Sequence, residues 1–372
     1  TRCLKSPFLT QGPEVENFEN EICTKVDAPF CVAVSNASAG LHIAMIAIEV
    51  GPGDLVWTTP ISFVATAACA LHQGAFIDFI DIDPKTWNID IDLVEERLTQ
   101  AASKNFPLPK AIVAVHFAGL PCDMGRLRRL TQQFGIFLIE DAAHALGATY
   151  LSDGSIYSVG SSEHSDITVF SLHPVKPITS GEGGLITTGS IDLASKIREL
   201  RSHGITKDQN KFHEPNPPPW WYEQQDLGLN YRLSDIQAAL GRSQLQKLSG
   251  FISTRKELSE LYKISLNDEP LDLQFTPAGY GHAHHIEVIK LNDPLFRLDL
   301  FSYLQSQKIG VNVHYIPLYK HPFISSMGYK FSDCPAAEDY YSKVITIPLH
   351  TQLEKKDIEF VSQHIKYFLE KS

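Results

Sequence analysis

Several features that define other protein classes are absent from these 372 residues. No stretch approaches the ~18 apolar residues of a membrane-spanning helix, so no membrane span is expected. No run of lysine or arginine offsets the net charge of −11, which argues against a general nucleic-acid binder. The six cysteines form no Cys-x-x-Cys pair and lie mostly in apolar contexts, which is typical of reduced thiols in a cytoplasmic protein.

Two short motifs fall short of known sites. Residues 51–54 (GPGD) predict a turn, but no Gly-x-Gly-x-x-Gly helix start follows to make a dinucleotide site. His282, His284 and His285 suggest metal ligands, but metal-site spacing is missing elsewhere. We therefore expect no metal and place these histidines on a strand near a phosphate-bearing ligand. The chain starts at Thr1, without methionine and within a helix-like pattern, which predicts an incomplete N-terminus.

Short apolar runs alternate with helix-like segments between residues 31 and 190. Such runs suit strands that are buried on both faces of a mostly parallel sheet. The alternation predicts an α/β sandwich, in which functional groups gather beyond the carboxyl ends of the strands. The expected strands are 31–35, 55–58, 75–79, 111–116, 136–140, 167–171 and 185–188, with helices at 61–72 and 123–132 among those between them.

The rest of the chain predicts a second, smaller unit. Residues 206–226 are polar and rich in proline, and the pair Trp220 and Trp221 favours an ordered loop that makes contacts. Ser234 and Gln237 form a capping box that starts a helix. Strands are expected at 284–291 and 311–316. The sequence thus predicts a large domain at 1–250 and a small C-terminal α/β domain at 251–372.

Two residues at strand ends predict the chemistry of pyridoxal phosphate. Asp141 follows the apolar run 136–140, and Lys176 lies in a proline-bracketed turn between Ser171 and a glycine-rich stretch. A lysine amine can form a Schiff base with this cofactor, and a carboxylate can keep the ring nitrogen protonated. Taken singly, an exposed loop lysine and a helix-capping aspartate are the commoner interpretations. The two together favour catalysis.

Other residues near these strand ends suit a phosphate-bearing ring. The segment 35–40 (SNASAG) precedes the helical run 41–50 and would let backbone N–H groups, with the Ser38 hydroxyl, bind a phosphate. Phe63 could stack on a ring, although core packing is nearly as good an explanation. His144 could donate to the phenolic oxygen of the cofactor, although most single histidines are structural. Ser171 is a second phosphate candidate, and His314 and Tyr315 are candidate substrate-binding residues.

The chain resembles the fold-type I, pyridoxal-phosphate-dependent sugar aminotransferases of the DegT/StrS family. The similarity extends nearly from end to end. It lies in FLTQGPEVENFE (8–19), SNASAGLHIA (35–44), TTPISFVATA (58–67), IEDAAHALGA (139–148), FSLHPVKPITSGEGG (170–184), LRSHGI (200–205), LGLNYRLSDIQAALG (227–241) and VHYIPLY (313–319).

The resemblance implies roles for these residues. Lys176 would join the cofactor, Asp141 would face the pyridine nitrogen, and His144 would lie near the cofactor oxygen, where many relatives carry glutamine. Relatives often have Gly-Thr in place of Ala37 and Ser38. The remaining implied roles are phosphate binding by Ala37, Ser38 and Ser171, ring stacking by Phe63, and contact of Asn230 with the phosphate of the neighbouring subunit's cofactor, which implies a homodimer with shared active sites.

Two segments, 200–208 and 219–245, are similar to one branch of the family, the UDP-4-amino-4,6-dideoxy-N-acetyl-β-L-altrosamine transaminases of pseudaminic acid synthesis. The similarity implies that L-glutamate donates an amino group to C4 of a UDP-linked 4-keto-6-deoxy-N-acetylhexosamine. Three alternatives remain: an aminotransferase for another UDP- or dTDP-4-keto sugar, a sugar dehydratase of the same fold, and a non-catalytic sugar-nucleotide-sensing regulator. Dehydratase relatives replace the lysine by histidine, and a regulator would not need Lys176 and Asp141 together.

Overall fold

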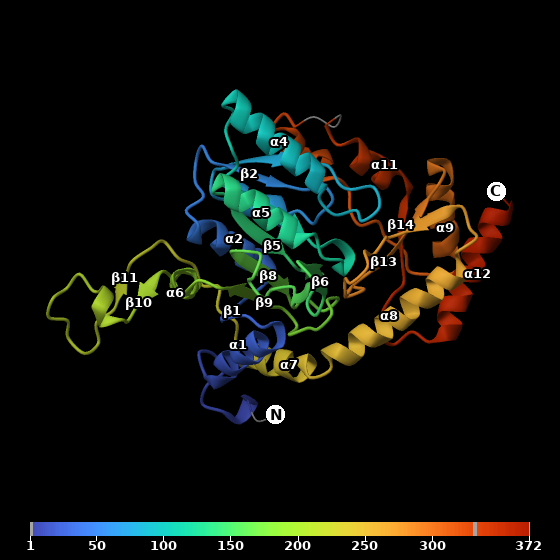
Figure 1. Cartoon of the computed structure of the whole chain (residues 1–372). Helices are drawn as coiled ribbons and strands as arrows, with labels where there is room; N and C mark the ends of the chain where they lie inside the picture. Colours follow the sequence, from blue (N-terminus) through green and yellow to red (C-terminus); the bar gives the residue numbers. More distant parts are fainter. Residues whose placement is uncertain (1–2, 330–332, 372) are drawn as a thin grey trace.

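The computed structural model describes residues 3–329 and 333–371. Its centre is a seven-stranded sheet with helices around it (Figure 1). Six strands run in one direction, and β9 runs antiparallel to both of its neighbours, β1 and β8. The predicted mostly parallel mixed sheet is confirmed. The strands lie in the order β1 (Phe30–Val34), β9 (Gly184–Thr188), β8 (Ile167–Ser171), β5 (Phe137–Asp141), β4 (Ala111–Val115), β2 (Leu55–Thr58) and β3 (Phe76–Phe79).

Helices cover both faces of this sheet because its strands are apolar on both sides. On β1, Val32 and Val34 belong to one hydrophobic cluster, whereas Cys31 and Ala33 belong to the other. The first cluster includes α2 (Ala37–Ala47), α3 (Ala65–Leu71) and α6 (Ile191–Leu200). The second includes α1 (Pro13–Val26), α4 (Ile91–Lys104), α5 (Met124–Phe134) and α7 (Asp235–Leu245).

The C-terminal part contains a second, smaller sheet with its own hydrophobic cluster, which extends from Leu258 to Ile365. Its three antiparallel strands are β12 (Leu271–Leu273), β13 (Glu287–Leu291) and β14 (Val344–Ile347). The domain boundary at residue 250 stays a prediction. The helices of this part are α8 (Leu248–Ser265), α9 (Arg297–Ser306), α10 (Pro322–Ser325), α11 (Pro335–Lys343) and α12 (Lys355–Lys371).

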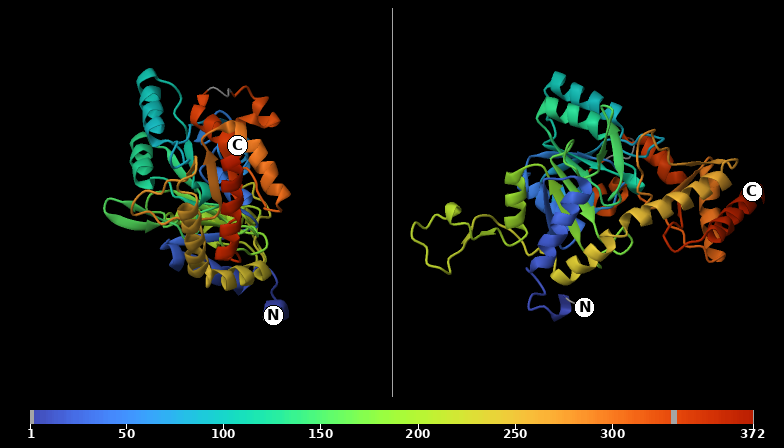
Figure 2. Two further views of the ribbon diagram at one scale, coloured as in Figure 1. Left: turned by 90° about the vertical axis from the view of Figure 1, so that its right-hand side faces the viewer. Right: turned by 60° about the horizontal axis from the view of Figure 1, so that its bottom comes forward.

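Two pairs of short antiparallel strands lie apart from the large sheet, one between β5 and β8 and the other after β9. Strands β6 (Thr149–Ser152) and β7 (Ser155–Ser158) form one. Strands β10 (Ile205–Thr206) and β11 (Glu223–Gln224) form the base of an arm that projects from the body of the molecule (Figure 2). In this arm the indole N–H of Trp221 donates a hydrogen bond to Glu223, whereas Trp220 is 78% exposed. Of the two tryptophans that were expected to make contacts, Trp221 therefore does so within its own chain and Trp220 remains largely exposed.

Four sequence predictions of elements need correction. The helix predicted at 61–72 begins only at Ala65, because the chain bends at residues 60–62 after β2. The segment 311–316 is not a strand: it forms a single bridge, between Asn312 and Thr346, and then leaves the small sheet. Strand β13 begins at Glu287 rather than at 284, because His284 has a positive φ of 47° that breaks the extended backbone. Helix α2 begins at Ala37 rather than at 41, since Asn36 already caps it. Along residues 3–329 and 333–371, no helix is both long and apolar enough to cross a membrane.

Candidate active site

A pocket of about 840 Å³ opens at the carboxyl ends of the parallel strands. Asn36 follows β1, Phe63 follows β2, Asp141 ends β5 and Ser171 ends β8, and all four line the pocket. The segment from Asn312 to Ile316 closes it from the C-terminal part of the chain. This is the edge at which open α/β sheets place their ligands.

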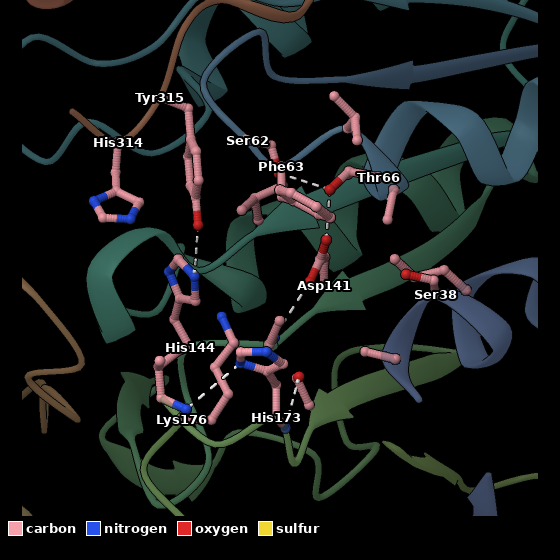
Figure 3. A pocket seen from close by; sticks show the side chains of 18 of the residues that line it. Ser38, Ser62, Phe63, Thr66, Asp141, His144, His173, Lys176, His314 and Tyr315 are labelled. Atoms are coloured by element: carbon pink, nitrogen blue, oxygen red, sulfur yellow. Dashed lines mark hydrogen bonds between the residues drawn. The ribbon is translucent and has the colours of Figure 1, made fainter. Parts of the chain in front are cut away.

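Lys176 reaches this pocket from the turn between β8 and β9 (Figure 3). The turn is held at its base, where Leu172 donates to the carbonyl of Gly183 and Ser180 donates to the carbonyl of Leu172. Burial lowers the pKa of the Lys176 amine from 10.5 to about 8, although the negative charge of Asp141 acts in the opposite direction. An appreciable fraction of this amine is therefore neutral, and nucleophilic, near neutral pH.

Asp141 lies in the same pocket and is only 6% exposed. Its Oδ2 accepts a hydrogen bond of 2.6 Å from Thr66, and its Oδ1 accepts one of 3.2 Å from the backbone N–H of Ala143. Two donors on different oxygens fix the plane of the carboxylate. The structure thus brings the predicted acid and the predicted lysine, which are 35 positions apart, to one cavity.

The N-terminus of α2 forms another wall of the pocket. Asn36 caps this helix by accepting from the N–H of Ala39, while Ala37, Ser38 and Ser171 line the cavity. A Cβ at Gly184 would lie 2.6 Å from the carbonyl carbon of Asn36, so only glycine lets β9 approach the helix so closely. N–H groups at a helix start, with two serine hydroxyls nearby, suit an anion such as phosphate.

His144 and Tyr315 meet on the opposite side of the cavity. The hydroxyl of Tyr315 lies 3.1 Å from Nε2 of His144, and the His144 and His285 ring centroids are 4.3 Å apart. Burial, followed by the charge of Lys176, lowers the pKa of His144 well below its usual value, so its ring is neutral. The predicted substrate residue Tyr315 therefore also contacts the predicted cofactor residue His144.

Two further predicted residues line the pocket, and one does not. Phe63 is 56% exposed on the cavity wall, and its ring centroid lies 6.4 Å from that of Tyr315. His314 lines the pocket, and its Nδ1 lies 2.9 Å from Thr346 Oγ1. Asn230 lies outside this pocket, exposed, and its backbone forms a bridge with Ser202.

Sequence reasoning missed the partners of the predicted residues. Thr66, which bonds to Asp141, and Ser62, which bonds to Thr66, lie within the quoted motif 58–67, but no local pattern marks their contacts. His173 and Glu182 also line the pocket. Among the residues that the structure describes, no group of three or more histidine, cysteine, aspartate or glutamate side chains could hold a metal ion.

The pocket fits pyridoxal phosphate on several independent observations. The start of α2 offers N–H groups to a phosphate, and the cradle between α2 and β9 exists only because residue 184 is glycine. Nδ1 of His144 is buried without a hydrogen-bond partner among the described residues, so it is available to a bound group. Lys176 and Asp141 supply the amine and the carboxylate that this cofactor requires.

Comparisons with known proteins point to the same chemistry. The profile of the DegT/DnrJ/EryC1/StrS aminotransferase family matches residues 1–366. The chain is 36% identical over 374 residues to the UDP-4-amino-4,6-dideoxy-N-acetyl-β-L-altrosamine transaminase of Campylobacter jejuni, with 100% of this chain and 94% of that protein covered.

Two solved structures are similar over almost the whole chain. Helicobacter pylori PseC, an aminotransferase involved in the biosynthesis of pseudoaminic acid, superposes with a TM-score of 0.88 at 27% identity, covering 100% of this chain and 95% of that chain. The sugar aminotransferase CalS13 from Micromonospora echinospora superposes with a TM-score of 0.84 at 27% identity, covering 98% of this chain and 94% of that chain.

Proposed function

Because the chain belongs to the DegT/DnrJ/EryC1/StrS aminotransferase family and is a pyridoxal-phosphate-dependent sugar aminotransferase, we propose that it acts in pseudaminic acid synthesis. It would transfer the amino group of L-glutamate to C4 of a UDP-linked 4-keto-6-deoxy-N-acetylhexosamine. The similarity to the Campylobacter transaminase over the whole chain supports this substrate. The expected fold class, enzyme class and cofactor are confirmed by the family.

One observation supports the residue roles above all others: an amine and a carboxylate from different strand ends face one cavity. Bound pyridoxal phosphate supplies a conjugated ring that withdraws electrons from the C–H bond next to the reacting nitrogen. Lys176 would hold this group through Nζ. Because burial lowers the pKa of this amine to about 8, its neutral form would be the base that accepts a proton from the carbon next to the reacting nitrogen.

The other residues bind and orient. Asp141, held by Thr66 and Ala143, would accept a hydrogen bond from the protonated ring nitrogen and keep that nitrogen charged. Ala37, Ser38 and Ser171 would hold the phosphate at the start of α2. His144 would donate to the ring oxygen, Phe63 would stack on the ring, and His314 and Tyr315 would contact the sugar nucleotide from the C-terminal part.

We also propose that the active enzyme is a cytoplasmic homodimer. Asn230 lies exposed outside the pocket of its own chain, so it could reach the phosphate only in a neighbouring copy. The arm that contains β10 and β11 leaves Trp220 exposed, as a segment that packs on a second copy would. All six cysteines are free thiols, which suits a reducing compartment.

A panel of substrates tests this proposal. Purified protein with pyridoxal phosphate and L-glutamate is offered UDP- and dTDP-linked 4-keto sugars, and the configuration of the amino sugar is read by NMR. The expected result is preferential amination at C4 of the UDP-linked N-acetyl substrate. Preference for a dTDP-linked or a differently configured UDP-linked sugar would contradict the proposed substrate, whereas the proposed transamination reaction would stand.

A second experiment separates the enzyme from a sensor on the same scaffold. L-Glutamate alone should change the cofactor absorbance of the wild-type protein, and Lys176→Ala should abolish both this change and turnover. A protein that binds the sugar nucleotide but shows no glutamate-dependent change of absorbance would be a regulator. Normal turnover by Lys176→Ala would contradict the role of the lysine.

A further inference from the structure

The hydroxyls of Ser62 and Thr66 form a short chain that ends on Asp141 (Figure 3). Ser62 Oγ lies 2.6 Å from Thr66 Oγ1, and Thr66 Oγ1 lies 2.6 Å from Asp141 Oδ2. Ser62 is 3% exposed and Thr66 is 1% exposed. Short bonds between buried groups that end on a carboxylate are the strong class of hydrogen bond.

The proton order along this chain follows from the number of donors. Each hydroxyl has one proton, and Thr66 gives its proton to Asp141. Toward Ser62, Thr66 can therefore only accept, so Ser62 must be the donor of the second bond. Both protons point toward Asp141, and such aligned bonds strengthen each other.

We propose that Thr66, supported by Ser62, is a positioning residue that holds the Asp141 carboxylate turned toward the ring nitrogen of the cofactor and away from Lys176. The inference rests on the proposed role of Asp141. An aspartate carboxylate rotates broadly about its last torsion angle unless donors hold it. Among the residues that the structure describes, the only other donor to this carboxylate is the N–H of Ala143, at 3.2 Å.

The charge of Lys176 explains why such a restraint matters. Asp141 is near enough to Lys176 to raise the pKa of the amine, while burial lowers it. A carboxylate that turned further toward the ammonium would pair with it. The amine would then be protonated at neutral pH, and the ring nitrogen would lose its partner. By holding Asp141, Thr66 would thus keep the pKa of Lys176 low and keep a carboxylate beside the ring nitrogen.

The test compares Thr66→Val, which removes the hydroxyl but keeps the shape, with Thr66→Ser, which restores it. Thr59→Val is the matched control, because Thr59 is also 1% exposed but its hydroxyl has no hydrogen-bond partner among the described residues. Two quantities are measured: the dissociation constant of pyridoxal phosphate, and the pH midpoint of the rate at which the cofactor-free protein captures it.

Thr66→Val should weaken cofactor binding about 10-fold or more and raise the midpoint of capture above 8 by about 0.5 to 1 pH unit. Thr66→Ser and Thr59→Val should behave like the wild type, and Ser62→Ala should shift both quantities in the same direction by less. In an Asp141→Asn background, Thr66→Val should add little, because a residue that acts through another is not additive with it.

The outcomes separate this inference from the proposed function. If Asp141→Asn impairs binding and rate while Thr66→Val leaves the affinity and the midpoint unchanged, the positioning role is wrong and the role of Asp141 stands. If Asp141→Asn itself behaves like the wild type, both fall. Should Thr66→Val fail to fold, an unchanged midpoint in Ser62→Ala, together with full additivity of Ser62→Ala and Asp141→Asn, would overturn the inference.

Discussion

The lysine in the pocket should destabilise the cofactor-free protein, and replacing it with methionine should reveal by how much. Burial lowers the pKa of Lys176 from 10.5 to about 8. A displacement of this size corresponds to about 3 kcal/mol against the charged amine in the native state. Methionine has a similar length and no charge, so Lys176→Met should raise the free energy of unfolding by about 2–3 kcal/mol at pH 7.

The dependence on pH gives this prediction its sign. Because the native pKa lies below the unfolded value, the unfolded wild-type chain binds more protons between pH 8 and 10.5. Its free energy of unfolding therefore rises with pH in that range relative to the methionine variant. The advantage of Lys176→Met should be largest below pH 8 and should vanish near pH 10.5.

Urea denaturation of the cofactor-free proteins at several pH values measures this difference. The exposed Lys85 supplies the control, because Lys85→Met should change the free energy of unfolding by no more than about 0.5 kcal/mol. Equal stability of Lys176→Met and the wild type at pH 7, or a difference that grows as the pH rises, would refute the reasoning. The comparison tests whether the site keeps a costly amine for its reactivity.

Three other predictions follow from particular contacts. Gly184→Ala should abolish or strongly weaken cofactor binding while the protein still folds, because the added Cβ would lie 2.6 Å from the carbonyl carbon of Asn36. Equilibrium titration with pyridoxal phosphate measures the dissociation constant of the variant. Burial raises the pKa of Glu287 from 4.5 to about 7, so the stability linked to its protonated form is full below pH 4.5 and is lost as the pH rises through 7. The free energy of unfolding of Glu287→Gln should therefore exceed that of the wild type by up to about 3 kcal/mol at pH 8 and should equal it at pH 4.5. Urea denaturation at the two pH values measures this difference. Lys176→Ala and Asn230→Ala should each be inactive alone, but mixing them should restore about a quarter of wild-type activity if two chains share each site, because half of the dimers are then mixed and each of these has one intact site. No recovery after subunit exchange would exclude shared sites.

Periodicity in the sequence was enough to place the main strands and to expect the two central candidate residues at one edge of the sheet, where both line one cavity. Apolar runs without alternation marked strands buried on both faces, and each expected strand of the large sheet lies within one residue of the observed one. Because parallel strands end at one edge, Asp141 and Lys176 could be placed in one site before any coordinates. These are local signals, since every strand is encoded by its own few residues.

Contacts between distant segments carried no such signal. Thr66 and Asp141 are 75 positions apart, and Tyr315 and His144 are 171 positions apart. The predicted strand at 311–316 also failed, because the way this segment meets the pocket and the small sheet, not its apolar content, sets its backbone. The sequence by itself determined which chemical groups stand at the ends of the strands, through side-chain periodicity and turn residues. Only the tertiary structure decided which hydroxyl, ring or helix end meets each group, because those pairs depend on how separately formed elements pack.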